Sequence, residues 1–230
     1  WLTGTRLDVP DLTNGAYIPA VDATAYLTRT QALRDKRWRV DNNLPGNRNF
    51  CPLVRRTDAL QVALAFDLAA ALAELDNEFG EDVLIRAAAW FTLKESRASF
   101  LIENEADKTD RIRRFAHVIG EHCGKIADPM SDESLRVLQG GILGEAALSM
   151  GVRRSPVMVG QSSLQGDIVH YIAPHFDDVA KMRDGLIEFE RATRGQEALA
   201  RAAAIAFGFV YVHPMSDGNG RIHRFLINDT

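Results

Sequence analysis

The sequence is poor in several features that would point to particular classes of protein. It has only two cysteines, Cys51 and Cys123, whereas a disulfide framework needs more. Its net charge is -4, so a broad cationic surface for duplex nucleic acid is not expected. The most apolar run, Ala202 to Val212, is shorter than the ~20 residues that a membrane-spanning helix needs. We therefore expect a cytoplasmic protein that binds neither duplex nucleic acid nor a membrane.

The remaining composition is that of an ordinary globular protein. Hydrophobic residues make up 46% of the chain and charged residues 25%, which is enough for one sizeable core. Residues 1–56 are rich in Pro, Asn, Asp and Gly. This composition predicts an irregular N-terminal extension, of unknown role, with at most one helix at about Ala23 to Arg37.

From residue 57 onward the apolar residues follow a helical period. The pattern predicts a first helix from Asp58 to a break at Gly80, with leucines on its apolar face, and places Trp90 and Phe91 in the core. Further helices are predicted at about 81–97 or beyond, 109–122, 132–150, 176–193 and 196–212. Residues 155–173 instead carry β-branched residues on both sides of a Gly/Ser/Gln centre, which predicts a β-hairpin that pairs Val157–Val159 with Ile168–Tyr171. The expected fold of residues 57–230 is thus all-α with one hairpin.

The most informative stretch is HPMSDGNGRIHR, from His213 to Arg224. Its D-G and N-G pairs are typical of hairpin turns, but its flanks favour another structure. An apolar helix is predicted before it, and the apolar residues after it recur at helical spacing. The start of a helix offers unpaired N–H groups and a partial positive charge, and glycines let the backbone approach an anion closely. We therefore expect a phosphate site, although the Walker pattern GxxxxGK[ST] is absent.

The charged residues of this stretch suit a nucleotide. Arg221 and Arg224 are three residues apart on one helix face, and two guanidinium forks match a di- or triphosphate. Asp217 supplies a hard oxygen ligand for Mg²⁺, which commonly binds through one carboxylate plus substrate phosphates. His213 is the natural general base near neutral pH.

These residues resemble the signature of Fic-domain proteins, H-x-F-x-[D/E]-G-N-G-R-x-x-R. Only Met215 departs from it, where the family usually has a packing Phe. The resemblance covers about residues 57–228 and implies a Fic-type helical bundle with a β-hairpin flap. It also implies Mg²⁺-dependent transfer of AMP from ATP to a Tyr, Ser or Thr hydroxyl of a target protein held on the flap. The implied roles are a base at His213, a metal ligand at Asp217, and nucleotide contacts at Gly218, Asn219, Gly220, Arg221 and Arg224.

Many members of this family carry an inhibitory motif, [S/T]-x-x-x-E-[G/N], before the core. SFLIEN matches it with Ser99, Glu103 and Asn104, within the region of about 81–104. The resemblance to the N-terminal inhibitory-helix class implies that Glu103 pairs with Arg224 and misplaces ATP. An ordinary helix end, with Asn104 as its cap, is the alternative.

Other functions also fit the motif. The domain could transfer phosphate or another nucleotide moiety, or it could be a nucleotide-binding regulatory or toxin module with little turnover. The target, the modified residue, any removal of AMP and the oligomeric state stay open.

Overall fold

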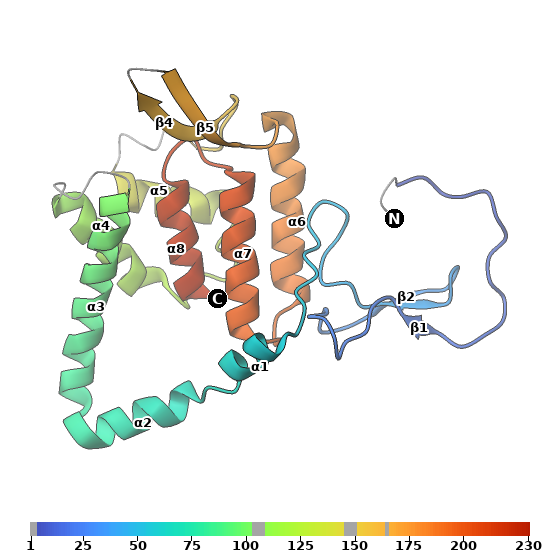
Figure 1. Ribbon diagram of the computed structural model, residues 1–230, viewed down its shortest axis with the longest axis horizontal. Coiled ribbons are helices and arrows are strands. Elements are labelled where there is room, and N and C mark those ends of the chain that lie inside the picture. Colours follow the sequence, from blue (N-terminus) through green and yellow to red (C-terminus); the bar gives the residue numbers. More distant parts are fainter. Residues whose placement is uncertain (1–3, 103–108, 145–150, 164–165) are drawn as a thin grey trace. The chain divides into compact units, whose positions relative to one another are not determined.

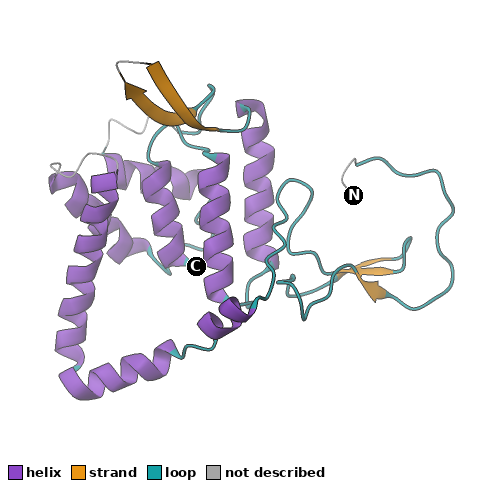
Figure 2. Cartoon of the chain, in the orientation of Figure 1, coloured by secondary structure: helices purple, strands orange, loops and turns teal. Residues whose placement is uncertain are grey.

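The computed structural model describes residues 4–102, 109–144, 151–163 and 166–230. Within them the chain is mainly helical, with eight α-helices, a hairpin and a small three-stranded sheet (Figure 1, Figure 2). The α-helices are α1 Asp58–Leu64, α2 Leu68–Phe79, α3 Glu81–Ile102, α4 Thr109–His122, α5 Asp132–Leu143, α6 Val179–Ala192, α7 Ala198–Val212 and α8 Asn219–Asp229. The strands are β1 Ile18–Pro19, β2 Leu33–Asp35, β3 Val40–Asn42, β4 Met158–Ser163 and β5 Gly166–Ile172. The prediction of an all-α fold is therefore right for most of the chain but missed the N-terminal sheet.

The described residues fall into two compact units. One contains Trp1–Leu60 and Ser155–His213, and the other contains Gln61–Arg154 and Pro214–Thr230. The boundary that the sequence predicts between residues 56 and 57 stays a prediction. Among the described residues, no helix has both the length and the apolarity needed to cross a bilayer.

The core of the first unit lies between α6 and α7, which pack side by side (Figure 1). Leu186 and Phe189 of α6, with Ile205 and Phe209 of α7, are at most 1% exposed. The apolar helix α7 is buried along most of its surface, although Phe207 is 68% exposed.

The N-terminal extension is packed into this core. The Phe50 ring meets Phe189 edge-on with 5.5 Å between ring centroids. A Cβ added to Gly208 would lie 2.5 Å from Phe50 Cζ, and one added to Gly185 would lie 2.8 Å from the Phe50 nitrogen. Glycines in α6 and α7 therefore make room for the extension.

The helix predicted at 23–37 is wrong. Strand β2 occupies part of this segment and pairs antiparallel with β3, whose other neighbour is the parallel strand β1. Aspartates explain the difference, because their side chains form local turns that compete with a helix. Asp22 accepts a hydrogen bond from the Thr24 amide at 2.8 Å, and Asp35 accepts one from the Arg37 amide at 2.9 Å.

The second unit is organised around α4, whose bounds match the prediction. It packs against α3, α5 and α8. Its buried face consists of Ile112, Phe115, Val118 and Ile119. Ile222 and Phe225 of α8 are fully buried within the same unit. The helix that follows the motif is therefore fixed by its apolar face.

The region from α1 to α3 departs from its prediction in two ways. The chain breaks between α1 and α2, where the Asp67 side chain accepts a hydrogen bond from the Ala70 amide at 2.9 Å and caps α2. The predicted apolar face is also largely exposed, with Leu68 at 61%, and Trp90 and Phe91 are 55% and 61% exposed. Periodicity identifies the apolar side of a helix, but it does not show whether another element covers that side.

Two further predicted elements can be compared with the structure, one in each unit. The predicted hairpin is confirmed: β4 and β5 are antiparallel, and Val159 lies opposite Tyr171. Helix α5 is shorter than predicted, since it ends at Leu143 and its C-cap Gly144 has φ 93. The predicted continuation falls on residues 145–150, which lie outside the described part of the chain.

Candidate functional site

The segment between α7 and α8 is held to the second unit by main-chain hydrogen bonds. The Arg153 amide donates to the Pro214 carbonyl at 2.9 Å, and the Ser216 amide donates to the Gly151 carbonyl at 3.0 Å. These bonds form a short antiparallel bridge just before the motif's acidic residue. The loop therefore has a fixed path although it belongs to no sheet.

Asn219 closes the loop with its side chain. Its Oδ1 accepts a hydrogen bond from the Met215 amide at 2.9 Å, and its Nδ2 donates to the Met215 carbonyl at 2.7 Å. Asn219 is 3% exposed and Met215 is 1% exposed. Met215 thus fills the packing position where the Fic signature has Phe, and Asn219 has a structural task that the sequence did not suggest.

Gln139 of α5 also holds the loop in place. Its Nε2 donates to the Asp217 carbonyl at 2.9 Å, and its Oε1 accepts from the Gly151 amide at 3.2 Å. Gln139 is 1% exposed. Gln139 was not among the predicted site residues; the signal that could have identified it is a polar side chain on the apolar face of α5, between Leu138 and Ile142.

The start of α8 has the features of an anion site. Gly218 is its N-cap, with φ 88, and as a glycine it makes no side-chain capping hydrogen bond. The amides of Arg221 and Ile222 donate to the Gly218 carbonyl. A helix begins with amides that have no partner within the helix, and its dipole favours negative charge there. The glycine is required because other residues adopt this backbone conformation only at a cost.

Asp217 lies at the edge of this helix start. Its Oδ1 accepts hydrogen bonds from the Gly218 amide at 2.6 Å and from Arg221 Nη2 at 3.3 Å. The side chain is 49% exposed. Because both bonds use Oδ1, the second carboxylate oxygen can still bind a cation.

The two motif arginines differ in their surroundings. Arg221 is 3% exposed, and its guanidinium lies over the Phe100 ring, 5.0 Å from the ring centroid. Arg224 is half-buried, and its Nη1 donates to the Gly220 carbonyl at 3.1 Å. Both come from the first two turns of α8, and Arg221 is the one with a described contact to Asp217.

His223 lies between these arginines in sequence and is half-buried. Burial lowers the pKa of its imidazole, and the nearby Arg224 charge lowers the pKa further. Both effects favour the neutral ring, because they penalise a second positive charge at this point of the helix.

His213 ends α7 in the first unit. It is the C-cap residue, with φ 51, and its amide donates to the Phe209 carbonyl at 2.9 Å. In the same unit, the hairpin is attached near this helix end, because the Tyr171 hydroxyl donates to the Tyr211 carbonyl and the two rings lie 5.8 Å apart. The predicted base and the predicted flap are thus carried by one compact unit.

The residues of the proposed brake are described only in part. Ser99 lies in the last turn of α3, whereas Glu103 and Asn104 lie outside the described residues. Their predicted roles stay predictions.

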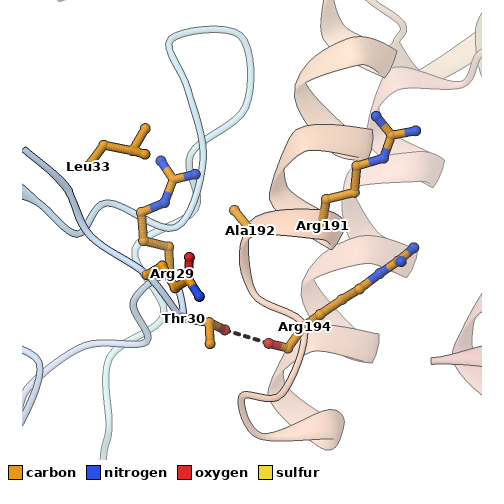
Figure 3. A pocket seen from close by; sticks show the side chains of 7 residues that line it. Arg29, Thr30, Leu33, Arg191, Ala192 and Arg194 are labelled. Atoms are coloured by element: carbon orange, nitrogen blue, oxygen red, sulfur yellow. Dashed lines mark hydrogen bonds between the residues drawn. The ribbon is translucent and has the colours of Figure 1, made fainter.

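A separate pocket of about 320 Å³ opens in the first unit, where the N-terminal extension meets the end of α6. Thr30 donates a hydrogen bond to the Arg194 carbonyl at its edge. Figure 3 shows that the side chains of Arg191 and Arg194 point away from Arg29. The three guanidinium groups therefore do not converge on one anion, and we assign this pocket no ligand.

A comparison with known protein families matches the part of the chain that contains α8. Residues 132–229 match the Fic/DOC family. Residues 132–229 are a Fic/DOC family domain. Members of this family are generally transferases that move a nucleotidyl group or a phosphate, and they typically use a nucleotide with Mg²⁺. In this Fic/DOC domain, α5 carries Gln139 and α8 carries the arginines, and α1 to α4 lie outside the matched residues.

Proposed function

We propose that this protein is an autoinhibited, Mg²⁺-dependent protein adenylyltransferase. The observation that carries the proposal is the start of α8 within the Fic/DOC domain. An uncapped helix N-terminus, an exposed carboxylate and two arginines meet there within eight residues of sequence, Asp217 to Arg224. This combination suits a polyphosphate bound with a divalent cation.

The residues of the loop would bind the nucleotide in distinct ways. The amides that follow Gly218 at the start of α8, including that of Gly220, would face the α-phosphate, and Asn219 would hold the loop in the shape that allows this. Arg221 and Arg224 would bind the β- and γ-phosphates through their guanidinium forks.

Asp217 fits the requirements of a Mg²⁺ ligand. Among the described residues there is no cluster of three or more His, Cys, Asp or Glu that could enclose a metal by itself. A single exposed carboxylate is, however, the usual protein contribution when substrate phosphates supply other ligands. When bound, Mg²⁺ would neutralise charge on the phosphates and so ease displacement at phosphorus.

His213 would act as the general base. It would take the proton from a Tyr, Ser or Thr hydroxyl of the target as that oxygen forms a bond to the α-phosphorus. The bond from the α-phosphorus to the bridging oxygen breaks, and pyrophosphate leaves. Only Pro214, Met215 and Ser216 separate His213 from Asp217 in sequence.

The hairpin would hold the target. Its strands carry exposed apolar side chains, among them Met158 at 61%, Ile168 at 54% and Ile172 at 63%. An extended segment of a target protein could add to such a hairpin through main-chain hydrogen bonds. The attachment of Tyr171 to Tyr211 would place that segment near the end of α7.

Glu103 would provide the brake. Its carboxylate, paired with Arg224, would occupy donors that the γ-phosphate needs and leave ATP bound in an unproductive position. The match SFLIEN at Ser99 to Asn104, before the Fic/DOC domain, supports this part of the proposal.

Transfer of label from ATP tests the proposed function. The purified protein and a cell lysate are incubated with ATP labelled at the α- or the γ-phosphate, and mass spectrometry identifies the adduct. We expect α-label on protein with Glu103→Gly, less with the wild type and none with His213→Ala. Label from the γ-phosphate would instead favour phosphate transfer. ATP binding without label in every variant would favour a nucleotide-binding module.

A further inference from the structure

Phe100 makes a contact that its position in sequence did not suggest. It lies in the last turn of α3, outside the Fic/DOC domain, and is fully buried. One face of its ring is covered by the Arg221 guanidinium, 5.0 Å from the ring centroid. The Phe115 ring of α4 supports it from another direction, edge-on at 6.3 Å. All three residues belong to the second unit.

This contact bears on how Arg221 presents its donors. The hydrogen-bond donors of a guanidinium point outward in its plane, and an aromatic ring beside the group restricts its rotation without acting as a strong hydrogen-bond acceptor. On the same side chain, Nη2 donates to Asp217 Oδ1 at 3.3 Å. The aromatic ring and the carboxylate both constrain the orientation of the guanidinium.

The aromatic ring is also suited to the burial of this arginine. Arg221 is only 3% exposed, and burying a cation is costly unless nearby groups stabilise the charge. Asp217 is half exposed, so its charge is screened by water. The electron-rich face of an aromatic ring also attracts a cation, and the ring carries no net negative charge that would repel phosphate.

We propose that Phe100 is a positioning residue for Arg221: its ring holds the guanidinium in the orientation that receives the nucleotide's phosphates. This inference rests on the proposed function, because it takes Arg221 as a phosphate ligand. It makes the end of α3 part of the nucleotide site independently of Glu103. An arginine held in place beforehand loses less conformational freedom when the ligand binds.

Nuclear magnetic resonance of the arginine side chains tests the contact without any nucleotide. In the wild type, the ring current of Phe100 should shift the Arg221 side-chain signals upfield. Phe100→Leu should remove that shift. Phe115→Leu is the matched control, since it removes a fully buried ring of the same cluster that does not stack on Arg221. An unshifted Arg221 signal in the wild type would overturn the inference.

Binding of a non-hydrolysable ATP analogue with Mg²⁺, measured by calorimetry, tests the consequence. Phe100→Leu should weaken binding about 3- to 10-fold, the effect of releasing one long side chain, whereas Phe115→Leu should leave it within about 2-fold. In an Arg221→Lys background, Phe100→Leu should have no further effect. Phe100→Tyr should restore affinity but not thermal stability, because it keeps the ring face and buries a hydroxyl.

The outcomes separate this inference from the proposed function. If the Arg221 signal shows the ring current but the wild type binds no nucleotide, the proposed function fails and the positioning role fails with it. If the wild type binds and Phe100→Leu binds equally well, only the positioning role is overturned. Equal losses in Phe100→Leu and Phe115→Leu would show a purely structural effect and would also overturn it.

Discussion

Residues of the motif depend on structural contacts that the sequence around them does not predict. Asp217 and Arg221 are in contact at the start of α8, and Arg224 lies in the second turn of the same helix. Their supports were not predictable from the motif. Gln139 and Phe100 lie far from the motif in sequence, and only packing brings them to it. The roles of the site residues in catalysis stay predictions.

The conformation of Gly218 leads to a prediction at this scale. Gly218→Ala should lower the free energy of unfolding by about 1 kcal/mol, because alanine is strained at positive φ. Its Cβ would also lie 3.3 Å from Leu143 Cδ1. The variant should in addition weaken binding of the ATP analogue, because the loop's amides would shift. Urea unfolding and calorimetry measure the two effects.

Gly124→Ala is the control for this substitution. Gly124 also has positive φ, 71, but no atom lies within 4 Å of an added Cβ. It should lose similar stability and bind the analogue normally. If the two variants bound the analogue equally well, the backbone conformation at Gly218 would have no part in the site.

Helices were predictable where a local signal marked both their ends and their buried face. The bounds of α4 match the prediction, and α5 begins after the Ser131 cap as expected. The break before α2 and the end of α5 were missed, because Asp67 and Gly144 compete with an apolar pattern that continues past them. The exposed faces of α2 and α3 show the second limit of such patterns, since periodicity does not supply a packing partner.

Replacing each of two helical glycines with alanine should change the stability of the protein in opposite directions. An alanine at Gly208 in α7 would place its Cβ 2.5 Å from atoms of Leu186 and Phe50. Gly208→Ala should therefore lower the free energy of unfolding by about 1–3 kcal/mol through overpacking. Gly120 in α4 has no neighbour within 4 Å of an added Cβ. Gly120→Ala should raise the free energy of unfolding by about 0.5–1 kcal/mol, because alanine favours a helix.

Chemical denaturation of both variants checks this pair. The comparison separates helix propensity, which favours alanine in both, from close packing with the N-terminal extension, which opposes it at Gly208 alone. A gain in stability at Gly208 would contradict the packing of Phe50 between α6 and α7.

At the scale of the whole chain, the N-terminal extension belongs to the same compact unit as the hairpin, α6 and α7. Besides Phe50, an ion pair between Arg56 and Glu197 joins it to the start of α7. A hydrogen bond from Arg56 lowers the pKa of the Glu197 carboxyl. The extension is therefore a structural part of the unit that carries His213, whatever else it does.

This ion pair predicts a dependence of stability on pH. Because the pKa of Glu197 is lower in the folded state, its contribution is present above the ordinary glutamate pKa, about 4.3. It is lost as the pH falls through the lowered folded-state value. The wild type should thus be more stable than Glu197→Gln near neutral pH, and the difference should shrink on acidification. Urea unfolding at several pH values measures it.

Arg56→Met offers the complementary control. It removes the partner that lowers the Glu197 pKa, so a further Glu197→Gln change should have little effect at any pH. A difference between wild type and Glu197→Gln that stayed constant with pH would contradict this account.

Local chemistry along the chain was sufficient to predict that the Fic/DOC domain is helical, that it contains the hairpin and that a glycine-rich loop precedes its last helix, because caps, glycines and apolar periodicity act over a few residues. The other features of the structure depend on packing between segments that are distant in sequence. This packing buried Gln139 against the loop, placed the Phe100 ring on Arg221 and built Phe50 into the core between α6 and α7. These contacts depend on which surfaces meet when the chain folds, and the order of residues along one helix does not contain that information.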